Sequence, residues 1–158
     1  MACDATARLY DVDEDSVVFK KLQKTTKYDQ GTVTFRAREG KLIDLDKLHE
    51  SVWATRLSGG TRSGLVSLDV AAIGQLVESD GKVMLKVSGS DAQFAIGQHS
   101  DKKLASVFDK LKGLPNDKIV KLTGRIDNYM GRWPSVLKKK PEKPRRLLVS
   151  SFEIVKVQ

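Results

Sequence analysis

Residues 116–127 read N-D-K-I-V-K-L-T-G-R-I-D, and residues 147–157 read L-L-V-S-S-F-E-I-V-K-V. In the first stretch apolar side chains alternate with polar ones: Val120, Leu122 and Ile126 against Lys121, Thr123 and Arg125. A period of two is typical of a strand with one buried face, because successive side chains point to opposite sides. The two stretches therefore predict a pair of strands near the C-terminal end, around which the rest of the chain is organised.

The connection between these strands is strongly basic. Residues 128–146 read N-Y-M-G-R-W-P-S-V-L-K-K-K-P-E-K-P-R-R, with seven Lys/Arg against a single Glu. This excess of six makes up most of the chain's net charge of +8, whereas residues 1–60 carry ten charges of each sign. A positive field this concentrated attracts polyanions, such as nucleic acid or an acidic protein.

Composition indicates an ordinary globular protein. The chain has 158 residues, of which 40% are hydrophobic and 30% charged, enough for one domain or two small ones with a buried core. It contains no apolar run long enough to cross a bilayer, and its first residues have no apolar leader. We therefore expect a cytoplasmic protein with no membrane insertion.

The front of the chain predicts a hairpin followed by a helix. Residues 16–22 and 32–37 are rich in β-branched and aromatic side chains, which favours two strands. Asp44 is a typical N-cap, and Ile43 before it is spaced to pack on Leu48, so a helix is expected over residues 43–57. The glycines that follow end this helix. Residues 1–62 are predicted to form one αβ element.

From residue 64 onward the pattern is mainly strands. Residues 65–77 alternate, with an expected bulge or bend at Gly74. Turns at residues 79–81 and 88–91 separate strands at 82–87 and 92–96, and Leu104, Val107, Phe108 and Leu111 mark a helix over 101–112. We expect the strand that begins at Leu65 to pair with the strand that begins at Lys118.

Three strands, a helix and two further strands is the order of an OB-fold, a five-stranded Greek-key barrel. Residues 65–157 resemble small bacterial OB-fold domains: residues 116–127 are similar to the fourth strand of such domains and residues 151–157 to the last. The fold class expected is thus a strand-rich α+β protein, with an αβ element at 1–62 and an OB-like barrel at 63–158.

A second resemblance concerns the front element. Residues 32–37 (T-V-T-F-R-A) and 43–52 (I-D-L-D-K-L-H-E-S-V) are similar to the third strand and second helix of a ferredoxin-like, heavy-metal-associated domain. That family binds soft metals through a Cys-x-x-Cys loop, but this chain has Cys3 alone, and soft cations need paired thiolates. His49 and His99 show no ligand spacing either. No metal and no cofactor are expected.

The sequence contains no arrangement typical of a catalytic centre, and we expect a non-enzymatic binding module. OB-folds grip oligonucleotides with the loop between strands four and five, which here would be the basic segment. Lysines and arginines contact phosphates, while aromatic side chains stack on bases. The predicted nucleic-acid-binding residues are Tyr129, Arg132, Trp133, Lys138, Lys139, Lys140, Lys143, Arg145 and Arg146 in the segment and Lys86 on a strand.

Other interpretations remain open from the sequence. The chain is alternatively a protein–protein adaptor, or a degenerate heavy-metal-associated-like protein, whose basic segment meets an acidic partner. A third interpretation is that the segment is a solvated, charged loop that binds no ligand. The expected ligand is single-stranded or structured nucleic acid.

Overall fold

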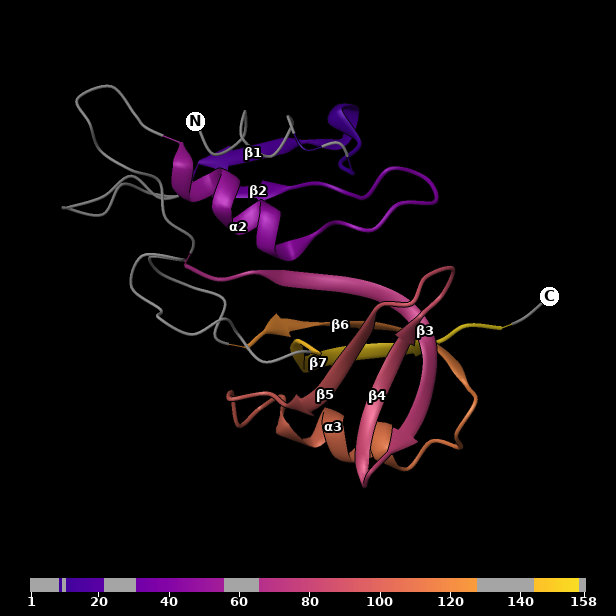
Figure 1. The fold of residues 1–158 in the computed structure, drawn as a ribbon. Helices are drawn as coiled ribbons and strands as arrows, with labels where there is room; N and C mark the ends of the chain where they lie inside the picture. Colours follow the sequence, from indigo (N-terminus) through magenta and orange to yellow (C-terminus); the bar gives the residue numbers. More distant parts are fainter. Residues whose placement is uncertain (1–8, 10, 22–30, 56–65, 128–143, 157–158) are drawn as a thin grey trace. The chain divides into compact units, whose positions relative to one another are not determined.

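The computed structural model describes residues 9, 11–21, 31–55, 66–127 and 144–156 (Figure 1). These residues form two compact units, one within residues 9–55 and the other from residue 66 onward. The predicted boundary between residues 62 and 63 lies outside the described residues. No described helix has the length and apolar character to span a membrane.

The first unit contains a hairpin and a helix, as predicted. A 3-10 turn, η1 (Glu14–Ser16), leads into β1 (Val18–Lys21), which pairs antiparallel with β2 (Gly31–Thr34). Helix α2 (Leu45–Ala54) follows. Asp44 is its N-cap, as expected, because its Oδ1 accepts hydrogen bonds from the backbone N–H groups of Asp46 (3.0 Å) and Lys47 (3.1 Å).

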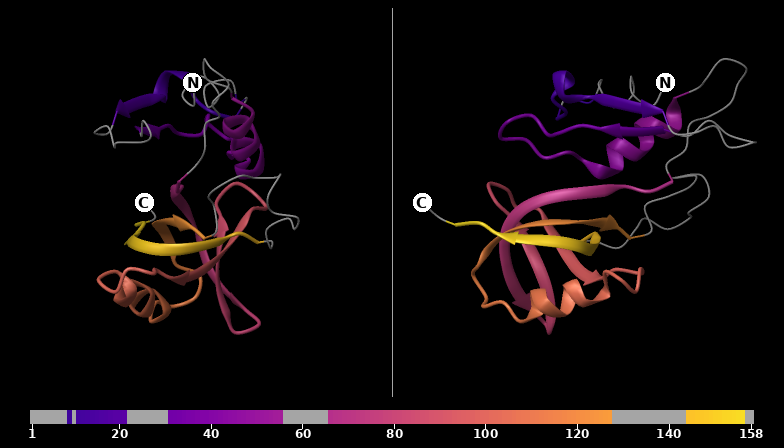
Figure 2. Two further views of the ribbon diagram at one scale, coloured as in Figure 1. Left: turned by 90° about the vertical axis from the view of Figure 1, so that its left-hand side faces the viewer. Right: turned by 180° about the vertical axis from the view of Figure 1, so that it is seen from behind.

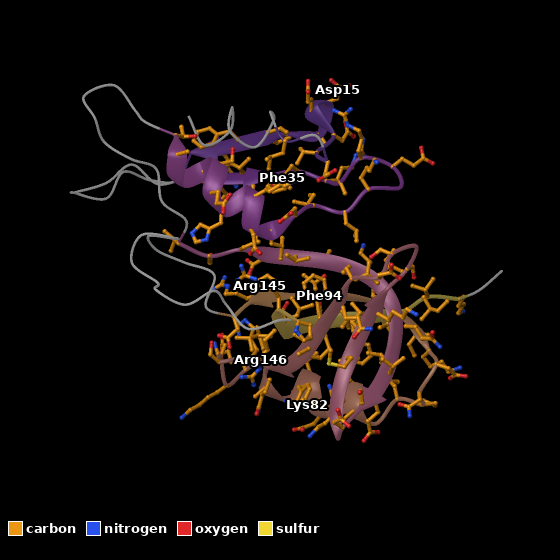
Figure 3. The ribbon with its side chains drawn as sticks, viewed as in Figure 1. Asp15, Phe35, Lys82, Phe94, Arg145 and Arg146 are labelled. Atoms are coloured by element: carbon orange, nitrogen blue, oxygen red, sulfur yellow. The ribbon has the colours of Figure 1, made fainter. Side chains whose placement is uncertain are left out.

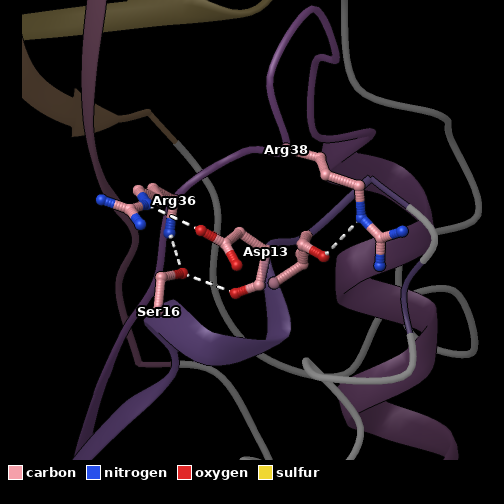
Figure 4. A network of polar contacts seen from close by, with 5 residues as sticks. Asp13, Ser16, Arg36 and Arg38 are labelled. Carbon is pink, nitrogen blue, oxygen red and sulfur yellow. Dashed lines mark hydrogen bonds and ion pairs between the residues drawn. The ribbon is translucent and has the colours of Figure 1, made fainter.

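A polar network ties the chain before β1 to the chain after β2 (Figure 4). The Arg36 Nε donates to Asp13 Oδ2 at 2.8 Å, and the Arg36 backbone N–H donates to Ser16 Oγ at 3.0 Å. The Ser16 hydroxyl in turn donates to the Asp13 carbonyl at 2.6 Å, and Arg38 Nε donates to the Val12 carbonyl at 3.3 Å. The hydrogen bond from Arg36 lowers the pKa of Asp13. The network fixes both strand ends at the surface of the unit.

The second unit is a five-stranded mixed sheet. Its strands are β3 (Asp69–Ser79), β4 (Lys82–Val87), β5 (Gln93–Gln98), β6 (Ile119–Ile126) and β7 (Arg146–Ile154). Each pairs with two others, in the cyclic order β3–β4–β5–β7–β6 and back to β3. The β5–β7 pair is parallel and the others are antiparallel. The predicted pairing of the first and fourth strands of this unit is confirmed by the β3–β6 ladder.

Strand β3 is shared between two neighbours. Residues 69–75 pair with β6 and residues 74–79 pair with β4, so the ladders overlap only at Gly74 and Gln75. Gly74 is buried, and a Cβ atom there would run into the backbone carbonyl group of Lys86, whose carbon lies 2.8 Å from the Cβ position. The sequence predicts a bulge or bend at Gly74. Both ladders run through Gly74 without a register shift, so there is no bulge, and the position needs glycine because two backbones approach closely.

The β6–β7 ladder carries one irregularity. Thr123 pairs with Ser151 and Gly124 with Val149, which leaves Ser150 as the extra residue of a bulge. The Ser150 hydroxyl donates to the Thr123 carbonyl at 3.0 Å, so the bulged residue makes a hydrogen bond across the ladder. Gly124 is a second close approach, because a Cβ atom on it would meet the Leu148 carbonyl oxygen.

The core of this unit is built from the inward faces of the strands and from α3 (Ala105–Lys112), which packs against β5 and β7 (Figure 2). The predicted alternation of β6 is confirmed, since Val120, Leu122 and Ile126 are buried while Lys121 and Arg125 are exposed. The other buried apolar side chains here are Leu76, Met84, Leu85, Val87, Ile96, Leu111, Leu147 and Val149.

The start of α3 corrects the sequence prediction. The sequence predicts a helix from residue 101, but the helix begins at Ala105 with no side-chain cap. Asp101 instead accepts a hydrogen bond from the Lys103 backbone N–H at 2.9 Å, and its carbonyl accepts from Leu104 N at 3.0 Å. These bonds close a separate turn before the helix. The fold class is confirmed as strand-rich α+β.

The buried face of α2 gives a direct test of the first unit. Leu48 is 2% exposed, so Leu48→Ala should lower the free energy of unfolding by about 2–5 kcal/mol, because a cavity forms. Glu50→Ala on the exposed side of the same helix should change it by less than about 0.5 kcal/mol. Urea unfolding followed by circular dichroism measures both, and equal effects would contradict the assignment of Leu48 to the core.

Gly74 gives a test of the second unit. Gly74→Ala should cost at least about 2 kcal/mol of stability, because the new methyl group forces the β3 and β4 backbones apart. Gly113→Ala is the matched control, since a Cβ atom there is 3.4 Å from its nearest neighbour and its φ of −76° suits alanine. That control should be neutral or stabilising by up to about 1 kcal/mol. A neutral Gly74→Ala variant would show that the two backbones are not in contact.

Candidate nucleic-acid interface

The basic segment begins and ends on neighbouring strands of the sheet. β6 ends at Ile126 and β7 begins at Arg146, and Ile126 pairs with Leu147. The Asp127 backbone N–H also donates to the Arg146 carbonyl at 2.9 Å. The two ends of residues 128–146 are thus held side by side, so the charge of the segment is attached at one place on the sheet.

Seven of the ten predicted site residues lie outside the described part of the chain: Tyr129, Arg132, Trp133, Lys138, Lys139, Lys140 and Lys143. The structure describes Lys86, Arg145 and Arg146, and it brings Lys86 and Arg146 onto the same face of the sheet. Arg145 takes a different position.

Arg146 lies across strand β5. It pairs with Ala95 in the parallel β5–β7 ladder, and its side chain is 57% exposed. Its guanidinium group passes over Gly97, where a Cβ atom would lie 2.9 Å from Nη2. One nitrogen, Nη1, is 3.7 Å from Asp127 Oδ2, a long and solvent-exposed ion pair that contributes little to stability. Arg146 therefore keeps more than half of its side-chain surface exposed; its position is labelled in Figure 3.

Arg145 is buried, with 7% of its surface exposed. Its carbonyl accepts a hydrogen bond from the Ala95 backbone N–H at 2.9 Å, which extends the β5–β7 ladder by one position. Its neighbour Arg146, the first residue of β7, is exposed, so the two adjacent arginines differ in their environment. Arg145 therefore supports the strand end and is not part of the exposed surface that carries Lys86 and Arg146.

Lys86 stands in a polar row across three strands. It pairs with Gln75 of β3 on one side and with Gln93 of β5 on the other, and all three side chains are exposed. Two residues before it on β4, Met84 pairs with Ala95, and Ala95 pairs with Arg146. Because residues two apart on a strand share a face, Lys86 and Arg146 belong to one surface.

We call this surface the β4–β5 face, which consists of Lys82, Met84, Lys86, Gln93, Ala95, Gly97 and Arg146. Its cationic groups surround the half-buried Ala95 and the buried Met84, so the face offers positive charge with only a small apolar area. Phe94 is not part of it, because Phe94 pairs with the fully buried Leu85 and follows the inward side. The face therefore has no aromatic group for stacking, and in the prediction that role falls to Tyr129 and Trp133.

The cations of the sheet differ in whether a carboxylate already neutralises them. Arg125 of β6 donates to Asp69 of β3 twice, through Nε at 2.9 Å and Nη2 at 3.3 Å, and these bonds raise the pKa of Arg125. Lys86 and Lys82 form no ion pair with any residue that the structure describes. On the β3–β6 side, Arg125 is thus compensated by Asp69, whereas Lys82 and Lys86 on the β4–β5 face carry uncompensated charge.

A surface hollow of about 290 Å³ adjoins this face at the bend of β3. It is lined by Gln75, Lys86, Ser88, Ser90, Asp117 and Ile119, among others. Lys86 and Gln75 belong both to the polar row and to the hollow. The sequence alone does not predict this hollow, because its walls come from strands and turns that are distant in the chain.

The described residues contain no group of three His, Cys, Asp or Glu side chains that would hold a metal ion. Comparison of the chain with known protein families, with curated proteins and with solved structures finds no match. What the protein binds must therefore be inferred from the charge and geometry of the interface itself.

Proposed function

We propose that the protein is a non-enzymatic module that binds single-stranded or structured nucleic acid, with the basic segment 128–146 and the β4–β5 face as its binding surface. We further propose that the five-stranded sheet is an OB-like barrel, with the αβ element before it as a separate unit. The cyclic strand pairing and the position of α3 between β5 and β6 in the chain support this assignment.

One observation carries the functional proposal. The ladders that join β6 to β7 and β7 to β5 attach a segment with an excess of six positive charges at the margin of the β4–β5 face. Lys82 and Lys86 add cations on the sheet itself, next to Arg146 of the segment. Contacts between such groups and phosphates release counterions, which is the main source of affinity in sequence-independent nucleic-acid binding.

The segment is tested by salt titration. Replacing Lys138, Lys139 and Lys140 together with Ala should weaken binding to all single-stranded oligonucleotides alike. The slope of log affinity against log salt should fall by about 0.7 for each phosphate that the protein no longer neutralises. Trp133→Ala should instead lower the binding free energy by about 1–3 kcal/mol with little change of slope, because stacking releases few counterions. Fluorescence anisotropy with a labelled oligonucleotide at several salt concentrations separates the two effects.

The sheet face is tested by a pair of lysines. Lys86→Ala should lower the salt slope by about 0.7, because Lys86 is exposed on the β4–β5 face. Lys121→Ala removes the same charge from an exposed strand position on β6, opposite Ile73, and should leave the slope unchanged. Equal reductions of slope in both variants would mean that binding depends on net charge alone. Absence of binding by the wild-type protein at low salt would refute the proposal, and the alternative of an adaptor with an acidic protein partner would then lead.

A further inference from the structure

The hollow beside Lys86 has walls that the fold holds in place. The Ser88 backbone N–H donates to the Ile73 carbonyl at 2.9 Å, and the Asp117 backbone N–H donates to the Leu76 carbonyl at 3.1 Å. Both turns are thus fixed to β3, on either side of its bend. Ser90 Oγ accepts from the Ala92 backbone N–H at 2.7 Å, which orients this hydroxyl and leaves its own proton available for a further bond.

The hollow combines several kinds of polar group beside one apolar side chain. Lys86 supplies an ammonium group, Asp117 a carboxylate and the two serines hydroxyl groups. Among the described residues, neither the Lys86 ammonium nor the Asp117 carboxylate forms an ion pair. The half-buried Ile119 adds an apolar side chain.

These groups match the parts of one nucleotide. The ammonium of Lys86 suits a phosphate, and the apolar side chain of Ile119, which pairs with Gln75 on the same face, suits a base or the carbon face of a sugar. The hollow has a volume of about 290 Å³, just below the range of roughly 300–1,000 Å³ for small-molecule pockets, and it is open to solvent, so it would contact one side of a single nucleotide rather than enclose it.

The carboxylate of Asp117 bears on the chemical class of the ligand. A carboxylate accepts hydrogen bonds but donates none, and beside a phosphate backbone it is repelled by like charge. It becomes favourable where the ligand presents a donor, which on a nucleotide is an N–H group of a base or the 2′-hydroxyl. Base donors differ from one base to the next, whereas every ribonucleotide carries the 2′-hydroxyl, so sequence-independent binding favours the latter. The 2′-hydroxyl distinguishes RNA from DNA and is such a donor.

We infer that the hollow is a ribonucleotide subsite, in which Lys86 contacts a phosphate and Asp117 accepts a hydrogen bond from the 2′-hydroxyl, so that the protein prefers RNA to DNA. This inference rests on the proposed function. Lys86 joins the two surfaces, because it belongs to the β4–β5 face and to the hollow at once.

The test compares two oligonucleotides of about a dozen nucleotides with one mixed sequence. One is RNA, and the other is DNA that carries deoxyuridine in place of thymidine, so that only the 2′-hydroxyl differs. The wild-type protein should bind the RNA roughly two- to tenfold more tightly, as expected for one hydrogen bond in an exposed site. Fluorescence anisotropy on the full chain at constant salt measures both affinities.

Two matched variants assign the preference. Asp117 and Asp80 are both exposed and both have positive φ, of 80° and 52°, so glycine replaces either without backbone strain. Each variant removes one negative charge and should strengthen binding to both oligonucleotides slightly. Asp117→Gly should in addition abolish the preference for RNA, whereas Asp80→Gly, in the β3–β4 turn away from the hollow, should retain it.

The outcomes separate the inference from the proposed function. Equal wild-type affinity for RNA and DNA, or an RNA preference that survives Asp117→Gly, overturns the subsite and leaves nucleic-acid binding intact. Failure to bind either oligonucleotide at low salt removes both. If circular dichroism shows that Asp117→Gly does not fold, Asp117→Ala is used instead, because it also removes the acceptor, at the cost of some backbone strain at positive φ. Loss of the RNA preference in that variant supports the subsite, and an unchanged preference overturns it.

Discussion

The second unit depends on the close approach of β3 and β4 at Gly74. Eleven residues of β3 serve two neighbours in turn, β6 through the first half and β4 through the second, and both ladders meet at Gly74 and Gln75. A strand changes partners in this way only if it bends strongly, and here the bend brings the Lys86 carbonyl to the place of a Cβ atom. A residue without a Cβ atom is therefore required where the two ladders meet.

Much of this architecture is predictable from local patterns. The alternation of β6, the N-cap at Asp44 and the Asp80-Gly81 turn each depend on neighbouring residues, so the sequence carries their signal directly. The start of α3 is not predictable in this way. Asp101 has a side chain suited to capping a helix, but it closes a separate turn before the helix. The extra residue in β7, Ser150, has no local signature, because a bulge is defined by the partner strand.

The candidate interface is predictable in charge but not in detail. Composition identifies the basic segment. It does not predict that Arg145 is buried, because nothing in the sequence distinguishes two adjacent arginines. Their positions at the start of β7 separate them: Arg146 extends over Gly97, while Arg145 joins the buried side. Likewise, only the β3–β6 register shows that Arg125 is neutralised by Asp69, 56 residues earlier. Free and compensated cations are distinguished by pairing across strands.

The same bend connects fold and function. Because β3 turns from β6 to β4 at Gln75, the residues beside that point come from both ladders: Lys86 on one side and Ile119 on the other. The turns that hold Ser88 and Asp117 are bonded to β3 close to the bend, at Ile73 and Leu76. A cation, a carboxylate and two hydroxyls are thereby gathered at a fixed point of the sheet, next to the face that carries uncompensated charge. The hollow and the position that demands glycine are therefore neighbours on β3, at Gln75 and Gly74.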